Sequence, residues 1–304
     1  MKKGHEILEV DGIEIEVSNR DKLIFPYDGI TKGDLIAYYE KISPVILPYL
    51  KNRLLTMVRY PAGILEEGFF QKDIAGYFPD WIERARVEKQ NGSVTHVVCN
   101  NTATLVYIAN LACISTHVTL SRIDSLHHPD QLIFDLDLDG GDFGPIRSAA
   151  IKLRALLAEI GLEAFLKTTG SSGLHVLVPL DRSSDFETVR TFARSVAVRL
   201  SEKFPRELTV EQRKEKRAGR VYLDVMRNSY GQTAASAYSV RARPGAPVSA
   251  PIDWEELDDG KLDSRRFNIR NIFGRLENRG DPWEAARDVK FSLENPGVRL
   301  AEII

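Results

Sequence analysis

The stretch QLIFDLDLDGGDFGPIRSAAIKLRALLAEIG, residues 131–161, decides the fold. Residues 131–138 predict an apolar strand punctuated by carboxylates, because side chains on a strand alternate between its two faces. Pro145 suits the first turn of a helix, and apolar side chains then recur at helical spacing until Gly161 ends the pattern. The stretch therefore predicts a strand followed by a helix with one apolar face.

The residues after this stretch complete a recognisable order of elements. Two strands over 164–169 and 174–179 are joined by a Gly/Ser turn, and a capping box of Ser184 and Glu187 precedes a helix over 186–203. A further strand covers 221–226. The order β-α-β-β-α-β is the ferredoxin-like, split βαβ arrangement, which is also that of RRM domains. We therefore expect an α+β fold.

The residues before it form a separate, mixed α/β module. Its expected elements are a hairpin over 6–17, a helix over 32–41 capped by Thr31 and limited by Pro44, a strand from 54, a hairpin turning at Asn91-Gly92, and an uncharged segment 105–114 that is either helix or strand. We expect two modules, residues 1–125 and 126–304, packed as one body.

Composition excludes several classes of protein. With 43% hydrophobic and 28% charged residues in 304, the chain is neither disordered nor of low complexity. Two cysteines, Cys99 and Cys113, form no metal-ligand spacing and predict reduced thiols in a cytoplasmic protein. The N-terminus lacks an apolar signal region, and asparagines interrupt the uncharged stretch 90–121, so we expect a soluble protein without a membrane span.

The net charge of −2 hides a local excess of basic residues. Residues 203–243 hold ten Lys and Arg against four Asp and Glu, or +6, which leaves −8 for the rest of the chain. A basic run is usually a solvated surface, but beside an acidic metal site it also suits a nucleic-acid backbone.

The carboxylates of the opening stretch are candidates for a metal site. Asp135, Asp137 and Asp139 would share one face of the strand, where they repel one another unless cations offset them. Hard oxygen ligands in this layout suit two ions of Mg²⁺ or Mn²⁺, as in polymerases and nucleases. The alternative is a strand end whose acids, Asp139 above all, point into solvent. A DxD pattern also occurs in phosphatases and glycosyltransferases.

Two later motifs fit the same site. The turn 170–173 offers backbone N–H groups and the Ser171 hydroxyl to phosphate oxygens, and His175 follows on a strand that can face the carboxylates. Asp224 lies inside an apolar strand, where a carboxylate needs a metal, an Arg or several donors. In the split βαβ order its strand can lie beside the DxD strand. The alternatives are an ordinary hairpin and a structural Asp–Arg pair.

Six motifs in register resemble the polymerase domain of bacterial DNA ligase D, within the archaeo-eukaryotic primase superfamily. They are Asp21-Lys22 with Gly29–Lys32, Arg59-Tyr-Pro, Gly68-Phe69-Phe70, Phe134–Asp137, Gly170–His175 and Tyr238–Val248. The similarity runs from about residue 18 to 275. It implies an archaeo-eukaryotic primase fold, in which an RRM-like catalytic sheet packs on the N-terminal module.

The resemblance also implies roles for single residues. Two divalent metals, Mn²⁺ or Mg²⁺, would be held by the catalytic residues Asp135, Asp137 and Asp224. The incoming NTP or dNTP would meet Arg59, His117, Ser171, His175 and Arg241, with His117 near the sugar favouring ribonucleotides. DNA would meet Asn19, Lys22 and Lys32 at a 5′-phosphate, Phe69 and Phe70 at the template, Arg217 on a basic loop, and an end-pairing loop at Asn91-Gly92. Val58, Ser172 and Gln232 replace lysines common in relatives, and Asp139 replaces a frequent proline.

The function implied is a DNA-directed primase-polymerase of non-homologous end joining. It would add nucleotides to a primer 3′-OH at 5′-phosphorylated gaps or broken ends, with Ku and a DNA ligase, separate or formerly fused, as partners. The alternatives are a non-catalytic module that bridges DNA ends and a replicative primase. Should the resemblance mislead, a DxD glycosyltransferase or phosphohydrolase is the remaining interpretation.

Overall fold

The computed structural model describes residues 5–74, 76–89, 92–140 and 142–302. They divide into two compact units. The first comprises Met1–Asp124, Thr233–Ser249 and Asn268–Asn271, and the second comprises Ser125–Gln232, Ala250–Phe267 and Ile272–Ile304. The first unit therefore contains the N-terminal residues together with two later segments, 233–249 and 268–271.

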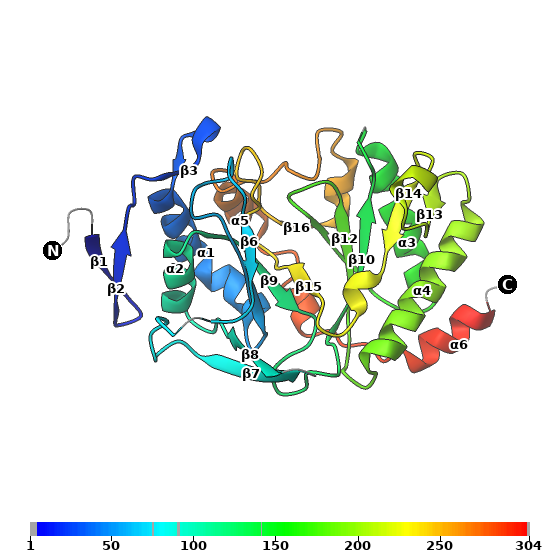
Figure 1. Ribbon diagram of the computed structural model, residues 1–304. Coiled ribbons are helices and arrows are strands. Elements are labelled where there is room, and N and C mark those ends of the chain that lie inside the picture. The colour runs from blue at the N-terminus through cyan, green and yellow to red at the C-terminus, as the bar shows by residue number, and fades with distance from the viewer. Residues whose placement is uncertain (1–4, 75, 90–91, 141, 303–304) are drawn as a thin grey trace. The chain divides into compact units, whose positions relative to one another are not determined.

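The second unit is built on a six-stranded sheet with the order β13-β14-β10-β12-β11-β16. Its strands are β10 (Gln131–Asp137), β11 (Phe165–Thr168), β12 (Leu174–Pro179), β13 (Leu208–Thr209), β14 (Val221–Asp224) and β16 (Pro251–Ile252). The four strands β14-β10-β12-β11 are antiparallel neighbours and have the ferredoxin-like order expected from the sequence (Figure 1).

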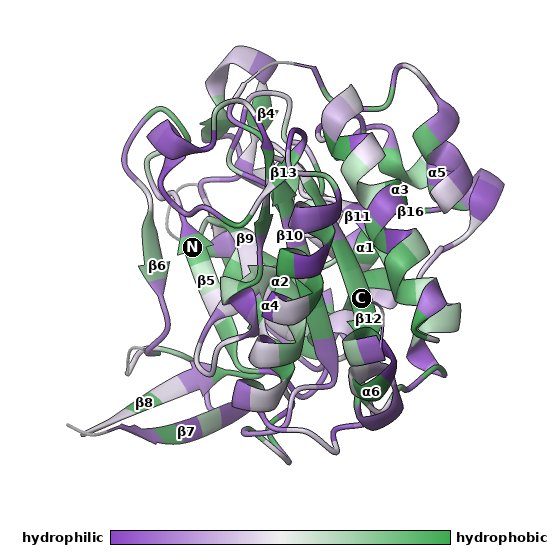
Figure 2. Ribbon diagram, turned by 90° about the vertical axis from the view of Figure 1, so that its right-hand side faces the viewer, coloured by the Kyte–Doolittle hydropathy of each residue, from purple (hydrophilic) through white to green (hydrophobic). Residues whose placement is uncertain are grey.

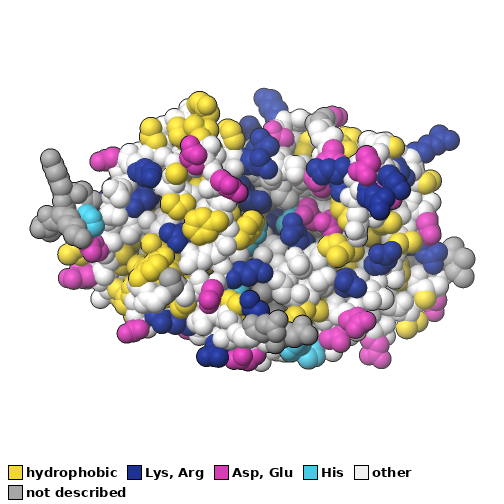
Figure 3. Space-filling view, viewed as in Figure 1, with side chains coloured by type: hydrophobic (Ala, Val, Ile, Leu, Met, Phe, Trp, Pro, Cys, Tyr) yellow, Lys and Arg dark blue, Asp and Glu magenta, His cyan; other side chains and the backbone are white. Residues whose placement is uncertain are grey.

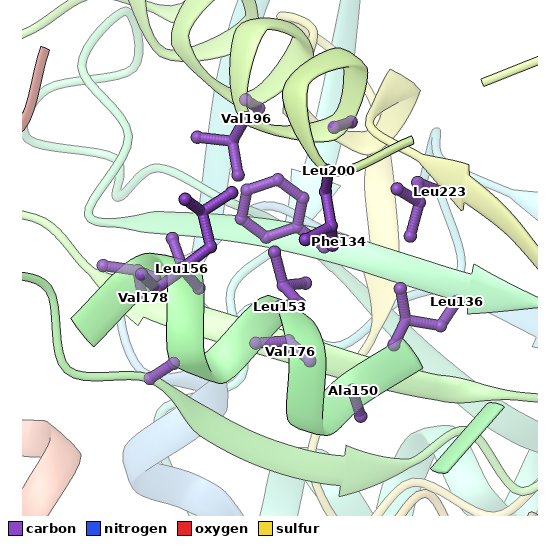
Figure 4. Close-up of a cluster of buried hydrophobic side chains, with 14 of the residues drawn as sticks. Phe134, Leu136, Ala150, Leu153, Leu156, Val176, Val178, Val196, Leu200 and Leu223 are labelled. Carbon is purple, nitrogen blue, oxygen red and sulfur yellow. The ribbon is translucent and has the colours of Figure 1, made fainter. Parts of the chain in front are cut away.

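Two helices, α3 (Gly144–Glu159) and α4 (Phe186–Lys203), cover one face of this sheet. The alternate β10 residues Leu132, Phe134 and Leu136 point toward them and are fully buried. Figure 4 shows Phe134 among Leu153 and Leu156 of α3 and Val196 of α4. Burial of this apolar layer stabilises the sheet and sends the other β10 side chains to its opposite face.

Further helices complete the second unit. They are α5 (Ile272–Arg279) and α6 (Glu294–Glu302), together with short 3-10 turns at 214–216, 226–228, 254–258 and 285–287. The expected capping box at Ser184 was wrong. Asp185 is the N-cap of α4, and its side chain accepts from the Thr188 N–H at 2.8 Å, because an Asp directly before the helix is at least as good an acceptor.

The first unit holds a sheet with the order β15-β9-β5-β8-β7, and β6 also pairs with β5. The strands are β5 (Leu55–Arg59), β6 (Phe69–Gln71), β7 (Arg84–Lys89), β8 (Gly92–Val97), β9 (Cys113–Thr119) and β15 (Thr233–Ala235). Antiparallel pairing of β7 with β8 confirms the hairpin expected there, and hydrophilic and hydrophobic residues alternate along β7 in Figure 2. Asn91, at its expected turn, lies outside the described residues.

Two helices pack together in the first unit, α1 (Lys32–Leu50) and α2 (Thr102–Asn110). The capping box of Thr31 and Asp34 confirms the expected start of α1. The expected end was wrong, because α1 continues through Pro44 and Pro48. Its buried face continues as well, and packing offsets the hydrogen bonds that the prolines remove.

The remaining elements are two small antiparallel pairs. The hairpin of β1 (His5–Val10) and β2 (Ile13–Ser18) confirms the predicted turn at Asp11-Gly12, and β3 (Leu23–Phe25) pairs with β4 (Ile30–Thr31) across a 3-10 turn at 26–28. The segment 105–114 contains both structures left open above, the end of α2 and the start of β9. None of the helices described is long and apolar enough to cross a membrane.

Candidate active site

Four polar residues form a line across the sheet of the second unit. Asp135 on β10 is the register partner of Asp224 on β14 and of His175 on β12, and His175 is the partner of Lys167 on β11. Register partners point to the same face of a sheet, and this face is opposite the one that α3 and α4 cover. We call Lys167, His175, Asp135 and Asp224 the charged row. The sequence predicted its last three members but not that Lys167 belongs with them.

Asp135 and His175 are a buried, coupled pair. The Nε2 atom of His175 lies 3.4 Å from Oδ1 of Asp135, and Arg227 lies 4.0 Å from Oδ2. The pKa of His175 is lowered to about 4, by burial first and then by the charge of Lys167, while Asp135 acts in the opposite direction. His175 is therefore neutral at pH 7 in the absence of an anionic ligand. Although burial raises the pKa of Asp135, its cationic and hydrogen-bonding neighbours bring it below the ordinary value, so this carboxyl group is ionised.

Asp224 faces a different balance. Burial raises its pKa above the ordinary value, the Met226 N–H at 2.8 Å opposes that rise, and the charge of Asp135 adds to it. A divalent cation between Asp135 and Asp224 would offset this repulsion. The register of β10 and β14 thus brings together two carboxylates 89 residues apart in the chain.

Asp137 lies one step along the same face of β10, opposite Tyr222. Its Oδ1 atom is buried and has no hydrogen-bond partner in the described part of the chain, and the same holds for Nδ1 of His175. Buried polar atoms normally find a partner, so both atoms are suited to a ligand. Within the described ranges, no three His, Cys, Asp or Glu side chains are arranged to hold a metal ion together. The carboxylate oxygens are nevertheless the donors that hard divalent cations prefer.

Arg217 lies within ion-pair distance of Asp137 and Asp139. Its guanidinium lies 3.9 Å from Asp137 Oδ2, 3.3 Å from Asp139 Oδ2 and 4.1 Å from the centre of the Tyr222 ring. Lys214 also pairs with Asp139 at 2.8 Å. Asp139 lies just beyond the end of β10 and is paired with Lys214 and Arg217. Arg217 was expected to contact DNA, but its side chain is only 7% exposed.

The Gly/Ser turn after β11 approaches β10 closely. A Cβ atom at Gly173 would lie 1.9 Å from the carbonyl oxygen of Leu136, so only glycine fits. The backbone oxygen of Ser171 accepts from Ser264 at 2.9 Å and from Arg265 at 2.8 Å. These contacts fix the turn at the start of β12, beside the backbone of Leu136 and Asp137 at the end of β10.

The first unit holds the other residues expected at a nucleotide. Arg59 donates to Leu111 O at 2.9 Å and to Gln71 Oε1 at 2.7 Å, and its guanidinium stacks over Phe69. His117 on β9 pairs edge-to-face with Phe70, at 5.8 Å between ring centres.

Phe69 and Phe70 are 45% and 66% exposed, so this aromatic pair is not core. Arg241 is half-buried, and its N–H donates to Pro247 O at 2.8 Å. Val58, where relatives often have lysine, is a buried residue of β5.

A cavity of about 970 Å³ opens at the start of α1. Asn19, with φ of 53°, accepts from the Lys22 N–H at 3.1 Å, and both residues line the cavity. Lys32 is buried, and its ammonium donates to Asn110 O at 3.1 Å and Asn110 Oδ1 at 2.9 Å. Burial and the Lys22 charge lower the pKa of Lys32 to about 8. Of the three residues expected at a 5′-phosphate, Asn19 and Lys22 therefore line the cavity, whereas Lys32 begins α1 and directs its ammonium to Asn110.

The sequence reasoning missed two cations of the second unit. Lys167 is 1% exposed. The sequence feature that could have identified it is a lysine within an otherwise apolar strand. Arg227 follows Asp224 by three residues, just after β14, and had no signal apart from this closeness. Figure 3 shows Lys and Arg side chains next to Asp and Glu side chains on this face of the molecule.

Comparison with known proteins agrees with the resemblance. A family profile described as "LigD, primase-polymerase domain" matches residues 31–283. The multifunctional non-homologous end joining protein LigD of Mycolicibacterium smegmatis is 34% identical over 270 residues, which cover 88% of this chain and 35% of that protein. The bifunctional LigD of Bacillus subtilis is 32% identical over 272 residues, covering 89% of this chain and 44% of that protein. The chain thus spans less than half the length of these relatives.

A solved structure gives the same result for the fold. The polymerase domain from Mycobacterium tuberculosis Ligase D, in complex with DNA, superposes with a TM-score of 0.85 at 32% identity. The match covers 91% of this chain and 99% of that one. The mixed α+β architecture expected from the sequence is confirmed by this superposition.

Proposed function

The chain belongs to the LigD primase-polymerase domain family, a family of nucleotidyltransferases, and from that premise we propose that it extends a DNA primer 3′-OH at 5′-phosphorylated gaps or broken ends in non-homologous end joining. The observation that carries the proposal is the charged row, because it joins Asp135, Asp224 and His175 on the face of the sheet opposite α3 and α4. Preference for ribonucleotides, through His117 near the sugar, is part of the proposal. Ku and a DNA ligase are the proposed partners.

The family implies divalent metals, and the donor set described above fits them. Asp135, Asp137 and Asp224 would hold two ions, Mn²⁺ or Mg²⁺. When bound, such ions lower the pKa of the primer hydroxyl and stabilise the leaving pyrophosphate. Asp135 is already ionised without them, and Asp137 offers an oxygen that no described protein group uses.

The other residues of the proposed site act on the triphosphate and the DNA. The Nδ1 atom of neutral His175 has no partner among the described residues, and an approaching triphosphate would favour its protonation and a charge-assisted hydrogen bond. Ser171, Arg59 and Arg241 would bind phosphate oxygens. Exposed Phe69 and Phe70 would stack on template bases, and Arg217 would contact the template strand. Asn19, Lys22 and Lys32 would bind the 5′-phosphate.

The decisive experiment is primer extension on a gapped duplex with Mn²⁺ and rNTP or dNTP. We expect extension to depend on the 5′-phosphate of the gap, and Asp135→Ala or Asp224→Ala to abolish extension while leaving phosphate-dependent DNA binding intact. Full extension by either variant would overturn the metal assignment. Extension that ignores the 5′-phosphate would overturn the gap-filling assignment.

A further inference from the structure

The cavity at the start of α1 contains a cation that none of the roles above uses, Arg20. The cavity walls come from β1, from the turn 19–22 and from the first turn of α1. We call this the α1 pocket; its lining includes Glu6, Asn19, Arg20, Lys22 and Asp34. The first N–H groups of α1 already donate to Lys22 O, Arg20 O and Thr31 Oγ1. An anion in the pocket would therefore be attracted by side-chain cations and by the positive end of the helix macrodipole.

Arg20 is fixed to the helix start through its backbone. Its carbonyl oxygen accepts the Gly33 N–H at 2.8 Å. An added Cβ atom at Gly33 would meet the Arg20 oxygen at 3.3 Å and its Nε atom at 3.4 Å. The guanidinium group therefore lies across the first turn of α1, on the wall of the pocket.

The charged end of Arg20 is held by an anion of the chain itself. Its Nη1 atom donates to Glu6 Oε2 at 2.8 Å, and the two side chains are 37% and 53% exposed. Such an exposed pair contributes little to stability, so a better anion can replace its carboxylate. Asp34, another acid of the pocket, is already used by Thr31 in the capping box of α1. Asp21 also lines the pocket, but it is Glu6 that is paired with Arg20 and would be exchanged.

We propose that Arg20 is an additional, specificity-determining cation of the α1 pocket, which exchanges Glu6 for a terminal phosphate of the DNA. This inference rests on the proposed function, in which the pocket receives a 5′-phosphate. A terminal phosphomonoester carries about 1.5 to 2 negative charges at pH 7, whereas an internal phosphodiester carries one. The planar guanidinium binds phosphate oxygens in pairs. Because Glu6 competes for Arg20, the exchange favours the doubly charged chain end over the rest of the DNA backbone.

The test measures binding to one gapped duplex with three versions of the 5′ end: phosphate, hydroxyl and the singly charged methyl phosphate. We expect Arg20→Gln to reduce the preference for phosphate over hydroxyl by roughly tenfold, with hydroxyl DNA bound as by the unmodified chain. Glu6→Gln should strengthen binding of the methyl phosphate and so narrow the discrimination between the two phosphates. That gain should vanish when Arg20→Gln is also present, because Glu6 acts through Arg20.

Two further variants separate the possible outcomes. Arg287→Gln removes an Arg with a comparable carboxylate pair, at 2.7 Å from Asp281, outside the pocket, and should retain the full phosphate preference. Lys22→Ala tests the pocket itself. If Lys22→Ala loses the preference and Arg20→Gln keeps it, the inference about Arg20 is wrong and the proposed function stands. If neither variant alters the preference, the pocket does not read the phosphate, and both fail. An equal gain from Glu6→Gln with and without Arg20 would also overturn the exchange.

Discussion

The charged row and the α1 pocket are held together in different ways. The register of three paired strands places Asp135, His175 and Asp224. In the α1 pocket, Arg20 and Glu6 meet only through the ends of two exposed side chains. The His175 and Asp135 side chains are 6% and 18% exposed, and an apolar layer of α3 and α4 supports the opposite face of their sheet. Glu6 belongs to β1, whose only strand partner among the described residues is β2.

The difference follows from what each region has to bind. A metal site needs carboxylates held in one geometry, and a sheet fixes them through backbone hydrogen bonds. Recognition of a chain end needs ion pairs that open when a better anion arrives, and solvent lowers the cost of opening them. The predictions below break each arrangement in turn.

The largest effect is expected within the metal-binding face itself, from Asp137→Asn. Asp137 belongs to β10 and has a buried oxygen without a described partner, whereas Asp139 lies beyond the strand and is bonded to Lys214 and Arg217. We expect Asp137→Asn to slow single-turnover extension at least about 10²-fold. The matched variant Asp139→Asn should stay within about tenfold of the unmodified chain. Similar losses in both would mean that the sheet register does not define the site.

The apolar layer that supports the charged row is tested by Phe134→Ala. Phe134 is 0% exposed, and the substitution leaves a cavity beneath the β10 carboxylates. We expect a loss of about 3–5 kcal/mol in the free energy of unfolding, measured with urea. Phe70→Ala, at a ring 66% exposed, should change stability by less than about 0.5 kcal/mol. A small loss for Phe134→Ala would show that the core does not hold the row in place.

The contrast also explains which features were predictable from the sequence. Alternation in 131–138 separates the carboxylates from Leu132, Phe134 and Leu136, and the β-α-β-β-α-β order predicts that the Asp224 strand can pair with β10. Both depend on local periodicity and on general topology, and the sheet order confirmed them. The length of α1 depends on tertiary packing across Pro44, and a local rule about proline cannot see that packing.

Charge partners were the least predictable part of the site. Lys167 joins His175 only through the antiparallel register of β11 and β12, and that register fixes a contact between residues eight apart across a turn. Glu6 and Arg20 are 14 residues apart and meet only because β1 folds back on β2. Identifying such pairs requires the three-dimensional positions of both side chains. The sequence indicated that these regions were charged, but not which cation neutralises which acid.

Removing the buried lysine of the charged row tests its electrostatics. Burial is the main reason that the pKa of His175 is lowered to about 4, and the charge of Lys167 is the next largest cause. In Lys167→Met we expect the pKa of His175 to rise toward its ordinary value, because protonation no longer places a second cation beside the first. NMR titration of the imidazole without metal measures this, with Lys152→Met on α3 as the control. An unchanged pKa would show that burial and Arg227 keep His175 neutral without Lys167.

The smallest effect is expected from the buried lysine of the first unit. The pKa of Lys32 is lowered from 10.5 to about 8, by burial first and then by Lys22. Between these values the unfolded chain binds a proton that the folded chain has lost, so the contribution of Lys32 to stability rises with pH through this window. Urea unfolding at about pH 7.5 and 9.5 should show the unmodified chain gaining stability relative to Lys32→Gln as pH rises. A gain in the opposite direction would mean that the two Asn110 oxygens hold the ammonium charged. The preference for a 5′-phosphate should weaken over the same range, because a neutral Lys32 no longer attracts the dianion.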